Sequence, residues 1–205
     1  MAEPFSSFTS RVIPLPLDNV DTDQIIPARF LKTTEKSGLA DALFNDWRRE
    51  ADGSLRDPPF VIDRPEMAGR QILLAGDNFG SGSSREHAPW SLTAWGIRAI
   101  LATSFADIFR NNALKNGLLP IVVPAETHRF VLDLLAADPE TELSVDLEAQ
   151  LVHLPGDEDL PFDVDPFAKQ MLLAGTDELG WLLQRMAAVE AYEADRPPTV
   201  DTRAS

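Results

Sequence analysis

The 205-residue chain contains no cysteine, and its three histidines, His87, His128 and His153, lie far apart in the sequence. Without cysteine the chain cannot form disulfides, use a thiolate nucleophile or hold a cysteine-ligated zinc or iron–sulfur centre. The dispersed histidines also lack the close spacing of a metal-ligand motif. We therefore expect no metal and no cofactor to be bound by this chain alone.

Basic residues are scarce. The chain has 18 Lys and Arg against 33 Asp and Glu, which gives a formal net charge of −15. Such a surface repels nucleic acid and anionic membranes, so we expect neither as a partner. An anionic ligand would need a local cluster of cations and backbone N–H groups. A protein partner with a basic face fits this charge, and so does a plain role in solubility.

Long apolar segments are absent as well. Runs such as residues 97–102 and 118–123 are far too short to span a bilayer, and residues 1–10 lack the pattern of a signal peptide. We expect a cytoplasmic protein. The 44% of hydrophobic residues are enough for a core. We expect a single domain over residues 1–195, followed by a loose polar tail at residues 196–205.

The middle of the chain alternates between strand and helix patterns. Strands are predicted at residues 71–75, 97–102 and 118–123, and helices at residues 84–95, 105–116 and 125–137. Gly96 and Gly117 stand where a helix end favours glycine, and Ser104 is expected to cap the second helix. This alternation predicts a mostly parallel sheet, with ligands gathering at the carboxyl ends of its strands.

The flanking regions have weaker patterns. Residues 12–17 predict an edge strand, because Pro14 and Pro16 interrupt it, and residues 60–63 predict another strand. The C-terminal region predicts a hairpin at residues 142–147 and 151–154, and helices at residues 164–174 and 176–194. The chain as a whole predicts an α/β fold with a helical C-terminal extension.

A glycine- and serine-rich turn follows the strand predicted at residues 71–75. Residues 80–87, called the serine turn below, read Gly-Ser-Gly-Ser-Ser-Arg-Glu-His. Gly80 and Gly82 permit positive φ and a close approach of the backbone to a ligand. The spacing matches neither a Walker phosphate loop, which needs a Gly-Lys-Ser/Thr, nor the dinucleotide fingerprint.

The polar residues of the serine turn indicate an anion site. If Ser83 and Ser84 open the helix, its unpaired N–H groups and dipole favour an anion there. Arg85 adds a planar cationic fork that suits a carboxylate. A simple helix cap is the alternative. A serine alkoxide stabilised by Arg85 would be a strong base, whereas His87 is better explained as a structural group.

A second candidate is the acidic run Asp21-Thr22-Asp23. Its two carboxylates can serve acid–base chemistry or orient a substrate hydroxyl, and an Asx-turn with a helix cap is the alternative. Arg29 and Lys32 follow nearby and can meet a carboxylate, although isolated surface cations usually have no specific role.

Several segments together resemble a known family. Residues 79–90 are similar to the signature of the aconitase-type swivel domain, and within that superfamily they look like the small subunits of 3-isopropylmalate dehydratase. Residues 19–27 resemble the N-terminal motif of that family. Further landmarks are residues 44–48, 104–109 and 146–150.

The resemblance implies a three-layer β/β/α swivel domain. It also implies a reaction, the isomerisation of 2-isopropylmalate to 3-isopropylmalate through 2-isopropylmaleate in leucine biosynthesis. The expected partner is a large subunit that carries a [4Fe–4S] cluster, and the expected substrate is a small dicarboxylic acid. The absence of cysteine here agrees with that division.

The resemblance also assigns roles to residues of this chain. Ser83 matches the base, Asp23 matches an active-site aspartate, and Ser84 and Arg85 match the groups that bind a substrate carboxylate. Thr22 and Gly82 are expected to take part in substrate binding. An apolar wall for the isopropyl group is expected from Ile25, Ile26, Phe30 and Leu31.

Two other interpretations stay open at this point. One is the small subunit of a related enzyme that acts on citramalate or homoaconitate. The other is a non-catalytic anion-binding module with the same fold, which would have no need for the combination of Ser83, Ser84, Arg85 and Asp23.

Overall fold

The structure is a computed structural model that describes residues 3–31, 38–156 and 158–196. The strands are β1 (Phe8–Leu15), β2 (Ile72–Ala75), β3 (Ala99–Ala102), β4 (Leu119–Val122), β5 (Glu142–Asp146), β6 (Leu151–Leu154) and β7 (Glu158–Pro161). The α-helices are α1 (Thr22–Ile25), α2 (Leu39–Ala42), α3 (Asn45–Arg48), α4 (His87–Trp95), α5 (Asp107–Lys115), α6 (Ala125–Ala137), α7 (Pro166–Ala174), α8 (Glu178–Leu183) and α9 (Met186–Ala194). Short 3₁₀ helices lie at Ala28–Phe30, Val61–Asp63 and Pro65–Met67.

The described strands form one mixed sheet in the order β4-β3-β2-β1-β5-β6-β7. Strands β1 to β4 run parallel, and β5 to β7 add an antiparallel half. Strand β1 joins the halves, because residues 8–11 pair with β5 and residues 12–15 pair with β2. Strand β1 as a whole is therefore central in the sheet, although residues 12–15, within the predicted edge strand, pair with β2 alone. Pro14 is tolerated because its part of β1 pairs on one side only.

Arg70 supports β1 where it changes partners. Its Nη1 donates to the carbonyl oxygens of Val12 and Pro139, both at 2.8 Å, and its Nε donates to the carbonyl of Glu66 at 2.9 Å. The side chain is almost fully buried. Buried charges need such partners, so Arg70 is a structural cation that ties the start of β2 to β1.

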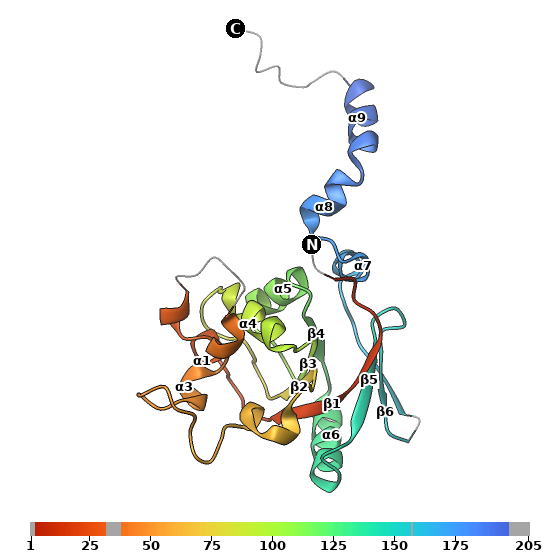
Figure 1. Ribbon diagram of the computed structural model, residues 1–205. Coiled ribbons are helices and arrows are strands. Elements are labelled where there is room, and N and C mark those ends of the chain that lie inside the picture. Colours follow the sequence, from red (N-terminus) through yellow and green to blue (C-terminus); the bar gives the residue numbers. More distant parts are fainter. Residues whose placement is uncertain (1–2, 32–37, 157, 197–205) are drawn as a thin grey trace.

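Two cores lie on opposite faces of the parallel strands. In β2, Leu73 and Ala75 pack with residues of α1, α2, α4 and α5, whereas Ile72 and Leu74 pack with residues of β5, β6, α6 and α7. Every residue of β2 and β3 is buried, as expected for parallel strands covered on both faces. Figure 1 shows α1, α3, α4 and α5 on one side of the parallel strands, and β5 and β6 with α7 on the other. The predicted α/β class with a β/β/α layering is confirmed.

Several local predictions are wrong at their boundaries or in type. Helix α4 begins at residue 87 rather than 84, and α5 at residue 107 rather than 105. Residues 61–63 form a 3₁₀ helix instead of a strand, strand β7 was not predicted, and the single helix expected over residues 176–194 is divided into α8 and α9. These features depend on tertiary packing, which periodicity does not encode.

Helices α8 and α9, called the C-terminal arm below, project from the body of the molecule (Figure 1). Neither helix contains a buried residue. Apart from Arg196, the predicted tail at residues 196–205 lies outside the described residues. The single domain over residues 1–195 stays a prediction. Within the described part of the chain, no helix is long and apolar enough to cross a membrane.

Candidate functional site

Three turns meet at the carboxyl ends of β1, β2 and β3. The turn after β2 lies in the middle and is bonded to both neighbours. On the β1 side, the Gly80 N–H donates to the carbonyl of Val20 at 2.7 Å. On the β3 side, the Phe79 N–H donates to the carbonyl of Ser104, and the Ala106 N–H donates to the carbonyl of Phe79, both at 3.1 Å. The start of the serine turn is therefore hydrogen-bonded to the turn after β1, and Phe79, the residue before it, to the turn after β3.

Gly80 is required by its surroundings. Its φ is +78°, and a Cβ atom there would lie 2.2 Å from Cγ of Phe109. The Phe109 ring packs against Phe79 with 5.3 Å between the centroids. Any side chain at residue 80 would displace this ring. Gly82 also has positive φ, +91°, but a Cβ there would meet only ordinary contacts.

The Asp21-Thr22-Asp23 run approaches the serine turn from β1. Asp21 and Gln24 form a capping box, with Gln24 N–H to Asp21 Oδ1 at 2.8 Å and Asp21 N–H to Gln24 Oε1 at 2.9 Å. Asp21 is thus a helix cap, which was the alternative interpretation. Thr22 is buried and donates to the serine turn, with its N–H to the carbonyl of Ser81 and its Oγ1 to the carbonyl of Ser83.

Asp23 and Arg85 form an ion pair across the two loops. The Arg85 side chain is mostly buried, whereas more than half of the Asp23 side chain is exposed. Ser83 and Ser84 are exposed beside this pair. The fold therefore places two hydroxyls, a guanidinium and a carboxylate on one surface, which can bind a carboxylate and exchange a proton.

The helix start does not lie where the sequence predicted it. Because α4 begins at residue 87, Ser83 and Ser84 belong to the preceding turn and not to the helix N-terminus. The Arg85 N–H donates to the carbonyl of Ser83 at 2.8 Å, and the Ala88 N–H donates to the carbonyl of Arg85 at 3.3 Å. The positive charge near the two serines is therefore supplied by the Arg85 side chain and not by the dipole of α4. The His87 ring packs against Trp90 at an interplanar angle of 50°, with 4.8 Å between the ring centroids.

Asp77 is a polar anchor that sequence reasoning missed. It accepts hydrogen bonds from Ser104 Oγ at 2.6 Å and Thr103 Oγ1 at 3.2 Å. The bond from Ser104, followed by that from Thr103, lowers the pKa of Asp77 below its ordinary value. Ser104 Oγ also accepts from the Asn78 N–H at 2.8 Å. Ser104 therefore fastens the turn after β2 and does not cap α5, whose N-cap is Ala106.

Comparison with known proteins identifies the family of this chain. The model of the aconitase C-terminal domain family matches residues 2–126, and the LeuD_N family model matches residues 131–166. The small subunit of 3-isopropylmalate dehydratase from Roseiflexus sp. is 54% identical over 202 residues, which cover 98% of each chain. The chain belongs to the 3-isopropylmalate dehydratase small-subunit family.

Other members of this family are similar over most of their length. The small subunit from Anaeromyxobacter dehalogenans is 57% identical over 194 residues, which cover 95% of this chain and 99% of that protein. The crystal structure of 3-isopropylmalate dehydratase (leuD) from Methanocaldococcus jannaschii has a TM-score of 0.65 at 26% identity, and the match covers 91% of this chain and 99% of that one. The swivel fold and the small-subunit family are thus supported by independent comparisons.

The four residues expected to form an apolar wall differ in exposure. Ile25 and Ile26 are completely buried in the core that also contains Leu73 and Ala75. Phe30 and Leu31 are half-buried and pack on that core from its edge. The Arg29 guanidinium donates hydrogen bonds to the side chains of Asn45 and Asp46. Lys32 lies outside the described residues.

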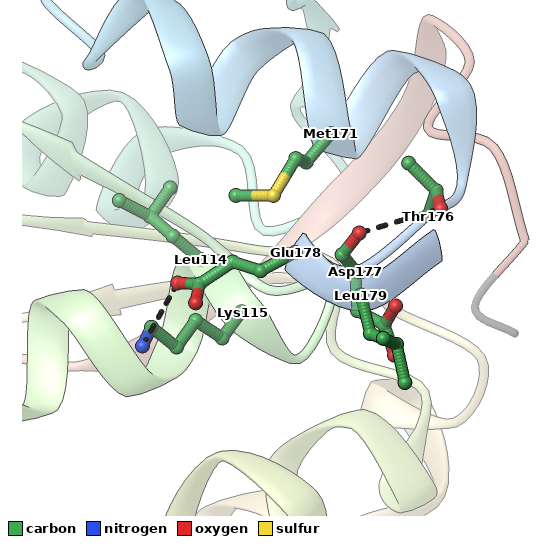
Figure 2. A pocket seen from close by; sticks show the side chains of 7 residues that line it. All are labelled: Leu114, Lys115, Met171, Thr176, Asp177, Glu178 and Leu179. Carbon is green, nitrogen blue, oxygen red and sulfur yellow. Dashed lines mark hydrogen bonds and ion pairs between the residues drawn. The ribbon is translucent and has the colours of Figure 1, made fainter. Parts of the chain in front are cut away.

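A metal site would need at least three His, Cys, Asp or Glu side chains close together. Among the described residues of this chain there is no such group. A hollow of about 280 Å³ lies between α5, α7 and the start of α8 (Figure 2). The ion pair between Lys115 Nζ and Glu178 Oε1, at 3.0 Å, crosses it. The lining includes the first residues of α8, so the hollow lies where the arm joins the body of the molecule. It shares no residue with the serine turn. Its lining residues are Leu114, Lys115, Met171, Thr176, Asp177, Glu178 and Leu179.

Proposed function

We propose that this chain is the small subunit of a 3-isopropylmalate dehydratase, and that the serine turn supplies the base and the carboxylate grip for the isomerisation of 2-isopropylmalate. The observation that carries the proposal is the exposed surface on which Ser83 and Ser84 stand beside the Arg85–Asp23 pair. The relatives at 52–57% identity, all named as small subunits of this enzyme, support the same function.

The chemistry assigned to this chain is a proton transfer. Ser83 Oγ removes a proton from the carbon next to a substrate carboxylate. The hydroxyl leaves the neighbouring carbon as hydroxide and takes up a solvent proton to become water, and the electron pair of the broken C–H bond forms the double bond of 2-isopropylmaleate. Return of water to the other carbon and of the proton to its neighbour gives 3-isopropylmalate. Ser84 and Arg85 hold a carboxylate during these steps, since a guanidinium binds a carboxylate through a fixed fork of N–H groups.

Asp23 holds Arg85 in place for that carboxylate. The pair fixes a long side chain whose guanidinium would otherwise be free to move. The positive charge of Arg85 also lowers the energy of an alkoxide at Ser83, because an opposite charge nearby favours the ionised form of a group.

The other half of the site belongs to a large subunit. A [4Fe–4S] cluster bound there would act as the Lewis acid for the departing hydroxyl. This chain has no cysteine and cannot supply thiolate ligands for such a cluster. Its exposed serine turn fits a site that is closed by a second protein.

The test is reconstitution with the candidate large subunit under anaerobic conditions, followed by an assay for 2-isopropylmaleate. We expect no turnover from this chain alone and turnover after mixing. Ser83→Ala should retain assembly and lose at least about 100-fold in turnover, as expected for removal of a general base. Ser144→Ala, far from the turn on β5, is the control. Turnover by the isolated chain, or full activity of Ser83→Ala, would contradict the proposal.

The substrate wall is tested separately. We propose that Phe30 and Leu31 form part of the apolar surface that accepts the isopropyl group, because they are the half-buried members of the four candidates. Phe30→Ala and Leu31→Ala should shift selectivity among 2-isopropylmalate, citramalate and homoaconitate in the assembled enzyme. Unchanged kinetics on 2-isopropylmalate in both variants would contradict this assignment.

A further inference from the structure

Thr22 connects the two loops of the site beside Ser83. Its N–H donates to the carbonyl of Ser81 at 2.8 Å, and its Oγ1 donates to the carbonyl of Ser83 at 3.1 Å. These two bonds hold the backbone on both sides of Gly82. Thr22 is only 1% exposed, so its hydroxyl faces the protein and cannot reach a ligand at the surface.

The serine turn needs such a support. Gly82 has a φ of +91° and is exposed, and glycine restricts its own backbone less than any other residue. Helix α4 begins four residues after Ser83 and therefore does not fix it. The Ser83 carbonyl also accepts from the Arg85 N–H, but that donor belongs to the same turn and moves with it.

Thr22 itself is firmly held. It is the first residue of α1, its carbonyl accepts from the Ile26 N–H at 3.0 Å, and the capping box of Asp21 and Gln24 closes the start of the helix. Ile25 and Ile26 are completely buried in the core beneath. The bond from Thr22 Oγ1 thus ties Ser83 to a rigid part of the molecule.

We propose that Thr22 is a positioning residue for the reaction, whose buried hydroxyl sets the position of Ser83 without touching the substrate. The inference rests on the proposed function, because it assigns Thr22 to the base of that reaction. It replaces the expected role of Thr22 in substrate binding. A small displacement of a reacting group is enough to cost between about tenfold and 100-fold in rate.

The experiment uses the reconstituted two-subunit enzyme with two changes at one position. Thr22→Val keeps the shape and the N–H and removes the hydroxyl, whereas Thr22→Ser keeps the hydroxyl. We expect Thr22→Val to assemble and to lower kcat between about tenfold and 100-fold with little change in KM. Thr22→Ser should recover most of the kcat.

Thr141→Val is the matched control. Thr141 is also buried, and its Oγ1 donates to the carbonyl of Asp138 at 2.7 Å in a turn before β5. This variant loses an equivalent bond far from the serine turn, so it should keep the wild-type kcat. An equal loss of kcat in Thr141→Val would overturn the positioning role.

Three further results would also overturn it. These are a wild-type kcat in Thr22→Val, a rise in KM without a change in kcat, and loss of assembly in Thr22→Val. The proposed function is judged on other measurements. If the wild-type complex does not form 2-isopropylmaleate, that function fails; if it does and Thr22→Val matches it, only the role of Thr22 fails.

Discussion

The serine turn and the C-terminal arm are held in opposite ways. The serine turn has exposed functional side chains, yet its backbone is bonded to neighbours on both sides and rests on a buried aromatic cluster. The arm is helical and therefore satisfies its own backbone, yet it buries none of its residues. Irregular structure can thus be held by hydrogen bonds to its neighbours, and regular structure can be weakly attached.

The contacts of the arm are few and lie near its base. Trp181 packs edge-on against Phe167 of α7, with 5.1 Å between the centroids, and Glu178 pairs with Lys115. The large apolar side chains Leu179 and Leu183 are 63% and 59% exposed. Because apolar burial supplies most of the stability of a helix in a protein, the arm should contribute little to the free energy of unfolding.

The largest expected effect is at Gly80. Gly80→Ala places a methyl carbon 2.2 Å from Cγ of Phe109 and a side chain at φ +78°, so we expect the free energy of unfolding to fall by about 3 kcal/mol or more. Gly69→Ala is the control, because Gly69 has φ +75° with open space around it, and should cost about 1 kcal/mol. Urea unfolding measures both; equal losses would show that the ring contact is unimportant.

A smaller effect is expected at the polar anchor. Ser104→Ala removes the bonds to Asp77 and to the Asn78 N–H, so it should lower the free energy of unfolding at neutral pH by less than Gly80→Ala does. The pKa of Asp77, measured by NMR titration, should rise toward its ordinary value. Ser144→Ala, which loses an exposed bond to Thr9, is the control and should have a smaller effect.

The same anchor predicts a pH dependence. The folded pKa of Asp77 lies below its unfolded value, so its stabilising contribution is present above the unfolded pKa and is lost as pH falls through the folded pKa. The stability difference between the wild type and Ser104→Ala should therefore shrink in acid. A difference that stays constant through the titration of Asp77 would contradict this assignment.

The smallest effect is expected in the arm. Leu183→Ala should change the thermal midpoint of the isolated chain by an amount equivalent to about 0.5 kcal/mol or less, because Leu183 is largely exposed. Leu172→Ala in α7 is the matched control, and its burial in the core predicts a loss of about 2 kcal/mol or more. A loss of similar size at both positions would mean that the arm is packed more firmly than its exposure indicates.

Much of the candidate site could be predicted from the sequence. Ser83 and Arg85 stand in one short run with glycines, and such a turn after a strand of a parallel sheet lies at the edge where ligands gather. The support of that turn could not be predicted. Asp77 and Ser104 are 27 residues apart, and Thr22 and Ser83 are 61 residues apart, so each contact exists only because β1, β2 and β3 are adjacent.

The wrong predictions have similar causes. Pro14 indicates an edge strand, and the half of β1 that contains it pairs on one side only, but β1 as a whole is central because its first half pairs with β5. Serines before an apolar periodic run indicate a helix start, but the bonds from Thr22 hold Ser83 in a turn, and α4 begins only at residue 87. In both cases a tertiary contact overrides a local preference.

By itself, the sequence determined the central alternation of strands and helices, the absence of cysteine ligands and the chemical content of the serine turn, because these depend on composition and short-range order. Only the tertiary structure decided that Asp23 meets Arg85, that Thr22 faces inward to Ser83, and that Ile25 and Ile26 belong to the core. The physical reason is that strand order brings distant loops together, and burial then determines which side chains of those loops remain available to a ligand.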